Sequence, residues 1–130
     1  MTDPISDLLI RIKNAAQTGK KHASVSYSKL MLNLLEVLEK EGFVEKISQK
    51  GKKPGDRSIE FEISYDGSKP KVKGTERVSR FSRRVYLKNK DIAAVRKGFG
   101  RVILTTPKGV MADREAIKEN IGGEALFRIW

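Results

Sequence analysis

The sequence predicts an α+β fold made of two small domains, an N-terminal α-β-α-β-β unit and a mainly β C-terminal domain with a short helix. Three observations support this fold: helical spacing of apolar residues before residue 42, strict apolar–polar alternation around residue 60, and a basic run that starts near residue 69. A chain of 130 residues with 38% apolar side chains can build two small cores. We expect the domains at residues 1–65 and 66–130.

The first predicted element is a helix that begins after Asp3. Aspartate suits the N-cap, and Pro4 suits the first helical position, where a missing N–H costs nothing. Apolar residues then recur at helical spacing until Gly19: Ile5, Leu8, Leu9, Ile12, Ala15 and Ala16. The opposite side of the helix carries a polar stripe, for which solvent is the default partner: Asp7, Arg11 and Asn14.

Strands and a second helix complete the N-terminal domain. A short strand over 24–27 precedes a helix that Ser28 caps and Gly42 closes. This helix is apolar nearly all round, so we expect it to be well buried. The remaining elements are a strand over 43–47, a hairpin loop over 49–56 and an alternating strand over 59–65.

The linker between the domains is expected at residues 66–70, Asp-Gly-Ser-Lys-Pro, because its composition favours turns and loops. The C-terminal domain then contains basic extended segments over 71–79 and 83–88, a short helix or turn over 91–97, strands over 102–105 and 125–130, and one or two helical turns over 113–118. We expect Asp113 to cap these last turns.

Positive charge is concentrated in one block of the chain. There are 27 Lys and Arg against 16 Asp and Glu, net +11. Residues 69–101 hold 12 basic and 2 acidic side chains, net +10, while residues 1–68 give 11 − 10 = +1 and residues 102–130 give 4 − 4 = 0. The block favours nucleic acid as a partner, ahead of a merely solvated face. Interspersed apolar residues disfavour a basic tail, and the lack of a long amphipathic helix disfavours a membrane surface.

Residue content disfavours metal, membrane and enzymatic functions. The chain has no cysteine and a single histidine, His22, and no run approaches the roughly 18 apolar residues of a membrane span. The Gly-Phe-Gly at 98–100 lacks the third glycine of a dinucleotide site, and Lys108 precedes Gly109 where a phosphate-binding loop needs the reverse order. We therefore expect no enzyme activity, no cofactor, no metal and no membrane partner.

Two loops carry binding chemistry. Residues 103–111 read Ile-Leu-Thr-Thr-Pro-Lys-Gly-Val-Met, in which threonine hydroxyls and a glycine suit contact with 2′-OH groups and phosphates. Residues 122–124, Gly-Gly-Glu, are expected to form a second close-approach turn whose carboxylate orients a hydroxyl. A plain structural turn is the alternative for each loop. Beside the basic block, both are consistent with a surface that faces RNA.

Specific motifs span the whole chain: Thr-Asp-Pro-Ile at 2–5, Arg-Ile-Lys-Asn at 11–14, Ser-Lys-Leu at 28–30, Glu-Gly-Phe at 41–43, Arg-Val-Ser-Arg at 77–80, Arg-Val-Tyr at 84–86, Gly-Phe-Gly at 98–100, Thr-Thr-Pro-Lys-Gly-Val-Met at 105–111, Asp-Arg-Glu-Ala at 113–116, Gly-Gly-Glu at 122–124 and the terminal Trp130. With these motifs the chain resembles the bacterial small-subunit ribosomal protein eight (S8) family.

The resemblance implies a structural constituent of the small ribosomal subunit in the cytoplasm. Such a protein binds the central domain of the small-subunit (16S) rRNA early and directly, and nucleates assembly of the platform. Its expected partners are this rRNA, neighbouring small-subunit ribosomal proteins and, since some members repress their own messenger, its own mRNA. An RNA-binding translational repressor or chaperone that acts outside the ribosome is the alternative.

The resemblance also implies which residues contact RNA. The C-terminal set, with two basic neighbours of the family motifs included, comprises Thr105, Thr106, Pro107, Lys108, Gly109, Gly122, Gly123, Glu124, Arg83, Arg84 and Tyr86. Contacts to a second RNA helix would come from Thr2, Asp3, Arg11 and Asn14. The chain departs from the family pattern where Pro107 replaces a serine and Phe81-Ser82 replaces proline-glycine. Both departures bear on the detailed contacts.

Overall fold

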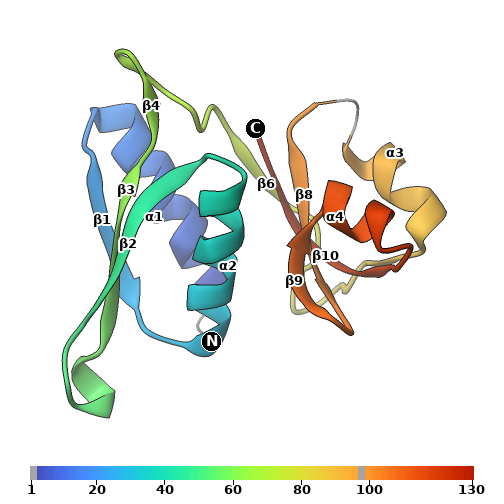
Figure 1. The fold of residues 1–130 in the computed structure, drawn as a ribbon, viewed down its shortest axis with the longest axis horizontal. Coiled ribbons are helices and arrows are strands. Elements are labelled where there is room, and N and C mark those ends of the chain that lie inside the picture. The colour runs from blue at the N-terminus through green and yellow to red at the C-terminus, as the bar shows by residue number, and fades with distance from the viewer. Residues whose placement is uncertain (1–2, 97–98) are drawn as a thin grey trace. The chain divides into compact units, whose positions relative to one another are not determined.

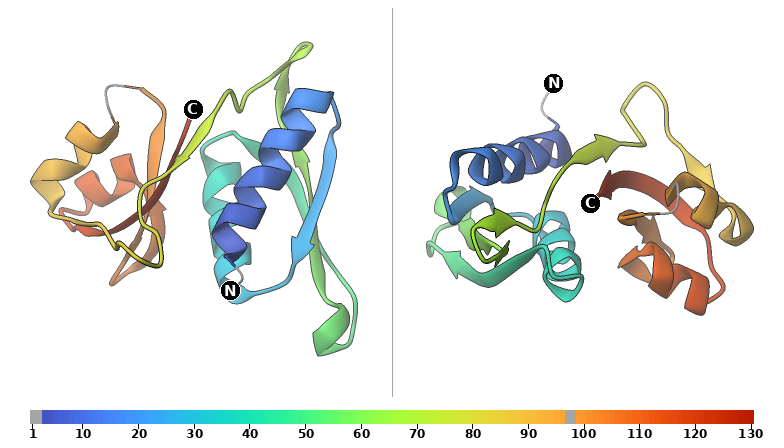
Figure 2. Two further views of the ribbon diagram at one scale, coloured as in Figure 1. Left: turned by 180° about the vertical axis from the view of Figure 1, so that it is seen from behind. Right: turned by 90° about the horizontal axis from the view of Figure 1, so that it is seen from above.

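The structure is a computed structural model that describes residues 3–96 and 99–130, and it divides into two compact units (Figures 1 and 2). The first unit ends at Lys73, and the second spans Gly74–Trp130. Each unit combines helices with an antiparallel sheet. The predicted α+β class is confirmed.

Within residues 3–73, helices cover a sheet with strand order β1-β3-β2, and a small hairpin follows it. The elements are α1 (Pro4–Thr18), β1 (His22–Ser26), α2 (Lys29–Lys40), β2 (Val44–Lys50), the 3-10 helix η1 (Pro54–Asp56), β3 (Ser58–Ile63), β4 (Tyr65–Asp66) and β5 (Lys69–Pro70). Both α-helices lie on one face of the sheet (Figure 1). The core between them includes Leu8, Ile12, Leu34, Leu38 and Phe61, all fully buried.

Local hydrogen bonds explain where these helices begin and end. The Asp3 carboxylate accepts from the Ser6 N–H at 3.2 Å, and the Ser28 hydroxyl accepts from the Met31 N–H at 3.1 Å, so both predicted N-caps are confirmed. Gly19 adopts φ +71 at the end of α1, a left-handed conformation that glycine tolerates.

Two predictions in this unit need correction. The strand predicted over 43–47 extends as β2 to Lys50, so the loop after it starts at Gly51 and not at residue 49. Residues 66–70 are not an open linker, because Asp66 pairs with Lys69 across the β4–β5 hairpin and Tyr65 pairs with Pro70. The division into compact units falls between Lys73 and Gly74.

Within residues 74–96 and 99–130, the second unit is a sheet with helices on one face. Its elements are β6 (Thr75–Arg77), β7 (Tyr86–Leu87), the 3-10 helix η2 (Asn89–Asp91), α3 (Ile92–Arg96), β8 (Arg101–Thr106), β9 (Gly109–Ala112), α4 (Asp113–Lys118) and β10 (Gly123–Ile129). The strand order is β6-β10-β8-β9, and β7 pairs with β10. Strand β10 thus holds the unit together, with β6, β7 and β8 all bonded to it.

The core of the second unit lies between the sheet and its helices. It is formed by buried residues from α3, β8, β9, α4 and β10: Ile92, Val102, Leu104, Met111, Ala116 and Ala125. The predicted aspartate cap is wrong. Ala112 occupies the N-cap, and Asp113 is the first helical residue, fully buried with Arg96 and Arg101 at 3.6 and 3.7 Å. Two arginines can offset the cost of burying this carboxylate, a role that local sequence does not indicate.

Candidate nucleic-acid interface

A row of side chains crosses four strands on one face of the C-terminal sheet. Tyr86 on β7 lies opposite Glu124 on β10, Glu124 lies opposite Thr105 on β8, and Thr105 lies opposite Val110 on β9. Residues directly opposite each other in antiparallel strands point to the same face, so these four form a continuous line. We call them the sheet row. The neighbouring residues on the strands, such as Leu104, face the core on the other side.

At the centre of the sheet row lies the carboxylate of Glu124, which is paired with Arg84. The Glu124 side chain is 10% exposed, and its carboxylate accepts from the Arg84 guanidinium at 3.2 Å. Arg84 is half exposed, so it shields one side of the carboxylate while remaining in contact with solvent. Tyr86 is 72% exposed, too much for a residue that serves the core. The row therefore offers a phenol, a carboxylate–guanidinium pair and a threonine.

The glycine pair at 122–123 approaches the protein's own backbone. A Cβ built on Gly122 would lie 2.3 Å from the Leu87 carbonyl oxygen, and one on Gly123 would lie 2.3 Å from that of Thr105. Gly123 and Glu124 belong to strand β10, so the expectation of a turn at 122–124 is wrong at these two positions. These glycines let β7 and β8 pack closely against the start of β10, and this packing brings the sheet row together.

The hairpin turn between β8 and β9 uses most of its polar groups internally. The Thr106 hydroxyl accepts from the Lys108 N–H at 3.1 Å and donates to the Gly109 carbonyl at 2.8 Å. The Lys108 ammonium lies 3.2 Å from the Glu119 carboxylate. Gly109 adopts φ +117, while exposed Pro107 fixes the first position of the turn. The two threonines therefore differ, because no hydrogen bond of the Thr105 side chain is found within residues 3–96 and 99–130.

A second tight turn carries the arginines. Arg80 and Arg83 exchange two backbone hydrogen bonds, of 2.9 and 3.1 Å, so Phe81 and Ser82 occupy the two central positions of a closed turn. Below it, the buried Ser79 hydroxyl accepts from the Val85 N–H at 2.9 Å. We call residues 80–84 the arginine turn. Its base is fixed by hydrogen bonds while its side chains face solvent.

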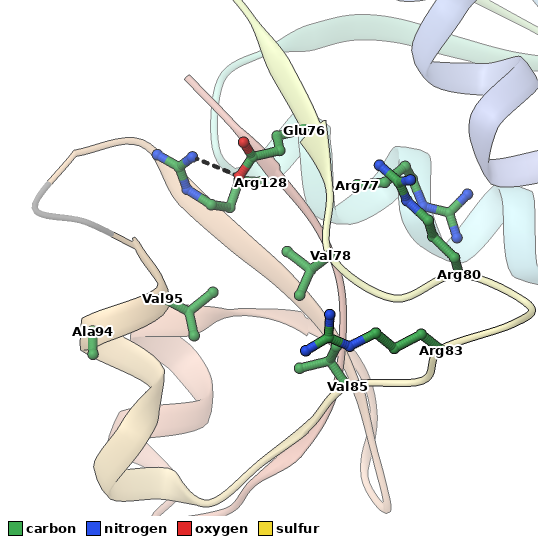
Figure 3. Close-up of a pocket in the computed structure, with 9 residues that line it drawn as sticks. All are labelled: Glu76, Arg77, Val78, Arg80, Arg83, Val85, Ala94, Val95 and Arg128. Carbon is green, nitrogen blue, oxygen red and sulfur yellow. Dashed lines mark hydrogen bonds and ion pairs between the residues drawn. The ribbon is translucent and has the colours of Figure 1, made fainter.

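A pocket of about 660 Å³ opens beside the arginine turn (Figure 3). Val78, Val85 and Val95 line it together with arginines, and the side chain of Arg83 extends toward Val85 and Val78. Arg128 is already held by Glu76 at 3.1 Å. Among the described residues, by contrast, neither Arg80 nor Arg83 has an ion-pair or side-chain hydrogen-bond partner.

Comparison with known proteins identifies the family. The family model of ribosomal protein S8 matches residues 3–130. The chain belongs to the ribosomal protein S8 family. It is 43% identical over 128 residues to "Small ribosomal subunit protein uS8" of Nitrobacter winogradskyi, covering 98% of this chain and 97% of that protein. Proteins of the same name from Acidiphilium cryptum and Mycoplasmopsis synoviae are 42% and 38% identical over 130 residues, covering all of this chain and 100% and 98% of theirs.

Membership of the S8 family confirms the resemblance seen in the motifs. The relatives are named as ribosomal subunit proteins and not as enzymes, which agrees with the expectation of no enzyme activity. Across the described ranges, no group of His, Cys, Asp or Glu side chains is arranged to hold a metal ion. In those same ranges, no helix has both the length and the apolar character needed to span a membrane.

In this S8-family chain, the structure brings together only part of the expected RNA-binding set. Glu124, Arg84, Tyr86 and Thr105 form one surface. The Thr106 hydroxyl is bonded within its own hairpin, and the Lys108 ammonium pairs with Glu119 at the end of α4. Sequence reasoning omitted Arg80, although its place in an Arg-Val-Ser-Arg-Phe-Ser-Arg-Arg run indicated a shared turn with Arg83.

The N-terminal expectations lie in the other compact unit. Thr2 lies outside the described residues. The Asp3 carboxylate caps α1 and also accepts from the Ser6 hydroxyl at 2.8 Å. Arg11 is bonded to Asp7 at 3.0 Å and donates to the Ser24 carbonyl at 3.2 Å, while Asn14 is exposed on the same helix. Asp3 has a sufficient structural role, whereas the exposed stripe that Asn14 shares with Arg11 stays a candidate contact surface.

Proposed function

We propose that this chain is a structural constituent of the small ribosomal subunit in the cytoplasm, and a primary binder of the central domain of 16S rRNA that nucleates platform assembly. The observation that carries the proposal is the sheet row, because three neighbouring strands place Tyr86, Glu124 and Thr105 on one face beside a block of net charge +10. Membership of the S8 family supports the ribosomal part of the proposal.

The row suits folded RNA better than a regular duplex. The exposed Tyr86 ring offers a surface on which an unpaired base can stack. The Thr105 hydroxyl can donate to a phosphate or accept from a 2′-OH group. Glu124 can accept from a ribose hydroxyl or a base amino group, while Arg84 keeps the buried carboxylate from being an isolated charge. Together these groups would read shape, unpaired bases and 2′-OH groups.

The arginine turn supplies phosphate contacts in this proposal. Arg80 and Arg83 are exposed and have no acidic partner in the described parts of the chain, so binding RNA breaks no existing ion pair. Each phosphate that such a cation neutralises releases a counterion, which makes affinity fall as salt rises. Lys108 and Arg11 are bonded to carboxylates and would contribute less.

A binding experiment tests the proposal. We expect the purified protein to bind a transcript of the 16S rRNA central domain more tightly than transcripts of the other 16S domains at one salt concentration. The protein should also sediment with small ribosomal subunits from cells. Equal affinity for all transcripts would contradict central-domain binding.

The same surface would serve the alternative function, an RNA chaperone or a translational repressor of its own mRNA that acts outside the ribosome. Sedimentation separates the two functions. A protein that binds folded RNA in vitro but is missing from ribosomal particles acts outside the ribosome.

A further inference from the structure

Phe81 is an aromatic side chain held in solvent on a fixed support. It is 50% exposed and lies within the turn that the Arg80–Arg83 backbone hydrogen bonds close. The Ser79–Val85 hydrogen bond, at 2.9 Å, fixes the base of the same turn. Ordering this backbone therefore costs little when a ligand binds, because the protein has already paid that entropy on folding.

The ring is also connected to the sheet row. The Arg84 guanidinium lies over the Phe81 ring, 5.5 Å from its centroid, and the same guanidinium donates to Glu124 at 3.2 Å. One arginine thus links the ring on the turn to the carboxylate at the centre of the row. The arrangement leaves an aromatic surface with a cation against it, next to groups suited to RNA.

Core packing does not explain the exposure of Phe81. Phe99 in the same unit is similarly exposed, at 54%, but its ring packs edge-on against Trp130 at 5.8 Å and near Arg128 at 5.3 Å. Within the described residues, Arg84 provides the ring contact found for Phe81.

The neighbours of Phe81 favour RNA over protein as the occupant. Arg80, Arg83 and Arg84 flank it within the same turn, and such a cationic rim attracts phosphates. An apolar protein surface would have to desolvate these cations without neutralising them. A nucleotide offers both a base that can stack on the Phe81 ring and a phosphate that can pair with the surrounding arginines.

We propose that Phe81 is a stacking platform for an unpaired RNA base, with Arg80 and Arg83 on the flanking phosphates. This inference rests on the proposed RNA-binding function and adds a base-stacking contact to the phosphate contacts proposed for the arginine turn. Stacking on a ring tolerates any base, so the platform would add affinity for unpaired RNA without adding a sequence preference.

Affinity measurements on a matched series test the platform, with the 16S central-domain transcript as the probe. Phe81→Leu keeps an apolar side chain but loses the π-face, and we expect the dissociation constant to rise about tenfold. Phe81→Tyr keeps the ring and should bind within about twofold of the parent. The control Phe99→Leu, which changes an equally exposed ring, should lower the unfolding temperature and leave RNA affinity within about twofold.

Each other outcome has a defined meaning. If Phe81→Leu binds within twofold of the parent, or if Phe81→Tyr loses as much affinity as Phe81→Leu, the platform is overturned. Unchanged RNA affinity with poorer incorporation of Phe81→Leu into small subunits would assign the ring to a protein contact and also overturn it. A parent protein that fails to bind the transcript would overturn the proposed function itself, which the series distinguishes because every variant is compared with the parent.

Discussion

The two tight turns of the C-terminal unit look alike in backbone but differ in what their side chains leave free. The hairpin turn at 106–109 satisfies its own groups, since Thr106 bonds Lys108 and Gly109, and Lys108 pairs with Glu119. The arginine turn is closed through backbone atoms, so Arg80 and Arg83 remain unpaired within the described ranges. A residue type suited to RNA contact is therefore not enough, because groups already bonded in the protein gain less from a new partner.

The largest expected effect comes from the arginine turn. The double variant Arg80→Gln/Arg83→Gln should flatten the plot of log affinity against log salt by about two units, one for each lost phosphate contact. The measurement is a salt titration of binding to the 16S central-domain transcript. Lys108→Gln is the matched control in the other turn, and its slope should change by less than about one unit. Equal slopes in the double variant and the parent would mean that Arg80 and Arg83 do not contact phosphates, and the two turns would then not differ in RNA binding.

The glycine pair tests whether close packing within the protein builds the sheet row. Gly123→Ala places a Cβ against the Thr105 carbonyl and should lower the free energy of unfolding by about 1–3 kcal/mol. Gly55→Ala is the control, since nothing lies within 4 Å of its added Cβ, and it should change stability by less than about 0.5 kcal/mol. Chemical denaturation of both variants gives the comparison. If Gly123→Ala is as stable as the parent but binds RNA poorly, Gly123 contacts RNA directly and does not serve packing within the protein.

The neighbouring threonines should separate binding from stability. Thr105→Val removes a hydroxyl that has no bond of its own within the described residues and should weaken RNA binding by about 1–3 kcal/mol with little change in unfolding temperature. Thr106→Val removes the hydroxyl that bridges Lys108 and Gly109, so the free energy of unfolding should fall by about 1 kcal/mol. Binding and thermal unfolding are measured on both variants. The reverse pattern would place the RNA contact on the hairpin turn.

The smallest effect is expected at the tip of the hairpin. Pro107→Ser restores the serine of the family pattern and should bind RNA as well as or slightly better than the parent, because a hydroxyl and an N–H return. Its unfolding free energy should fall by about 0.4–1 kcal/mol, since proline restricts the unfolded chain. Affinity and denaturation at one salt concentration check both parts. A marked loss of affinity would mean that the rigid proline itself shapes the contact.

Features that depend on neighbours along the chain could be predicted without the structure. The caps by Asp3 and Ser28 join residues three apart, and the alternation over β3 that buries Ile59, Phe61 and Ile63 is also local. The concentration of positive charge in residues 69–101 follows from the order of residues along the chain and needs no fold. The family motifs were likewise sufficient for the S8 assignment.

Which candidate residues share a surface, and which are already bonded, depends on how distant segments pack together. Glu124 meets Arg84 across 40 residues of chain, and Tyr86 and Thr105 join it through strand register. No short hairpin turn joins β10 to β7 or β8, so their register depends on which faces these strands bury together and cannot be read from a turn between them. For the same reason the prediction of a turn at Gly123 and the prediction of a helix cap at Asp113 are both wrong. Their partners, the Thr105 carbonyl for Gly123 and Arg96 and Arg101 for Asp113, come together only when the sheet and its helices pack.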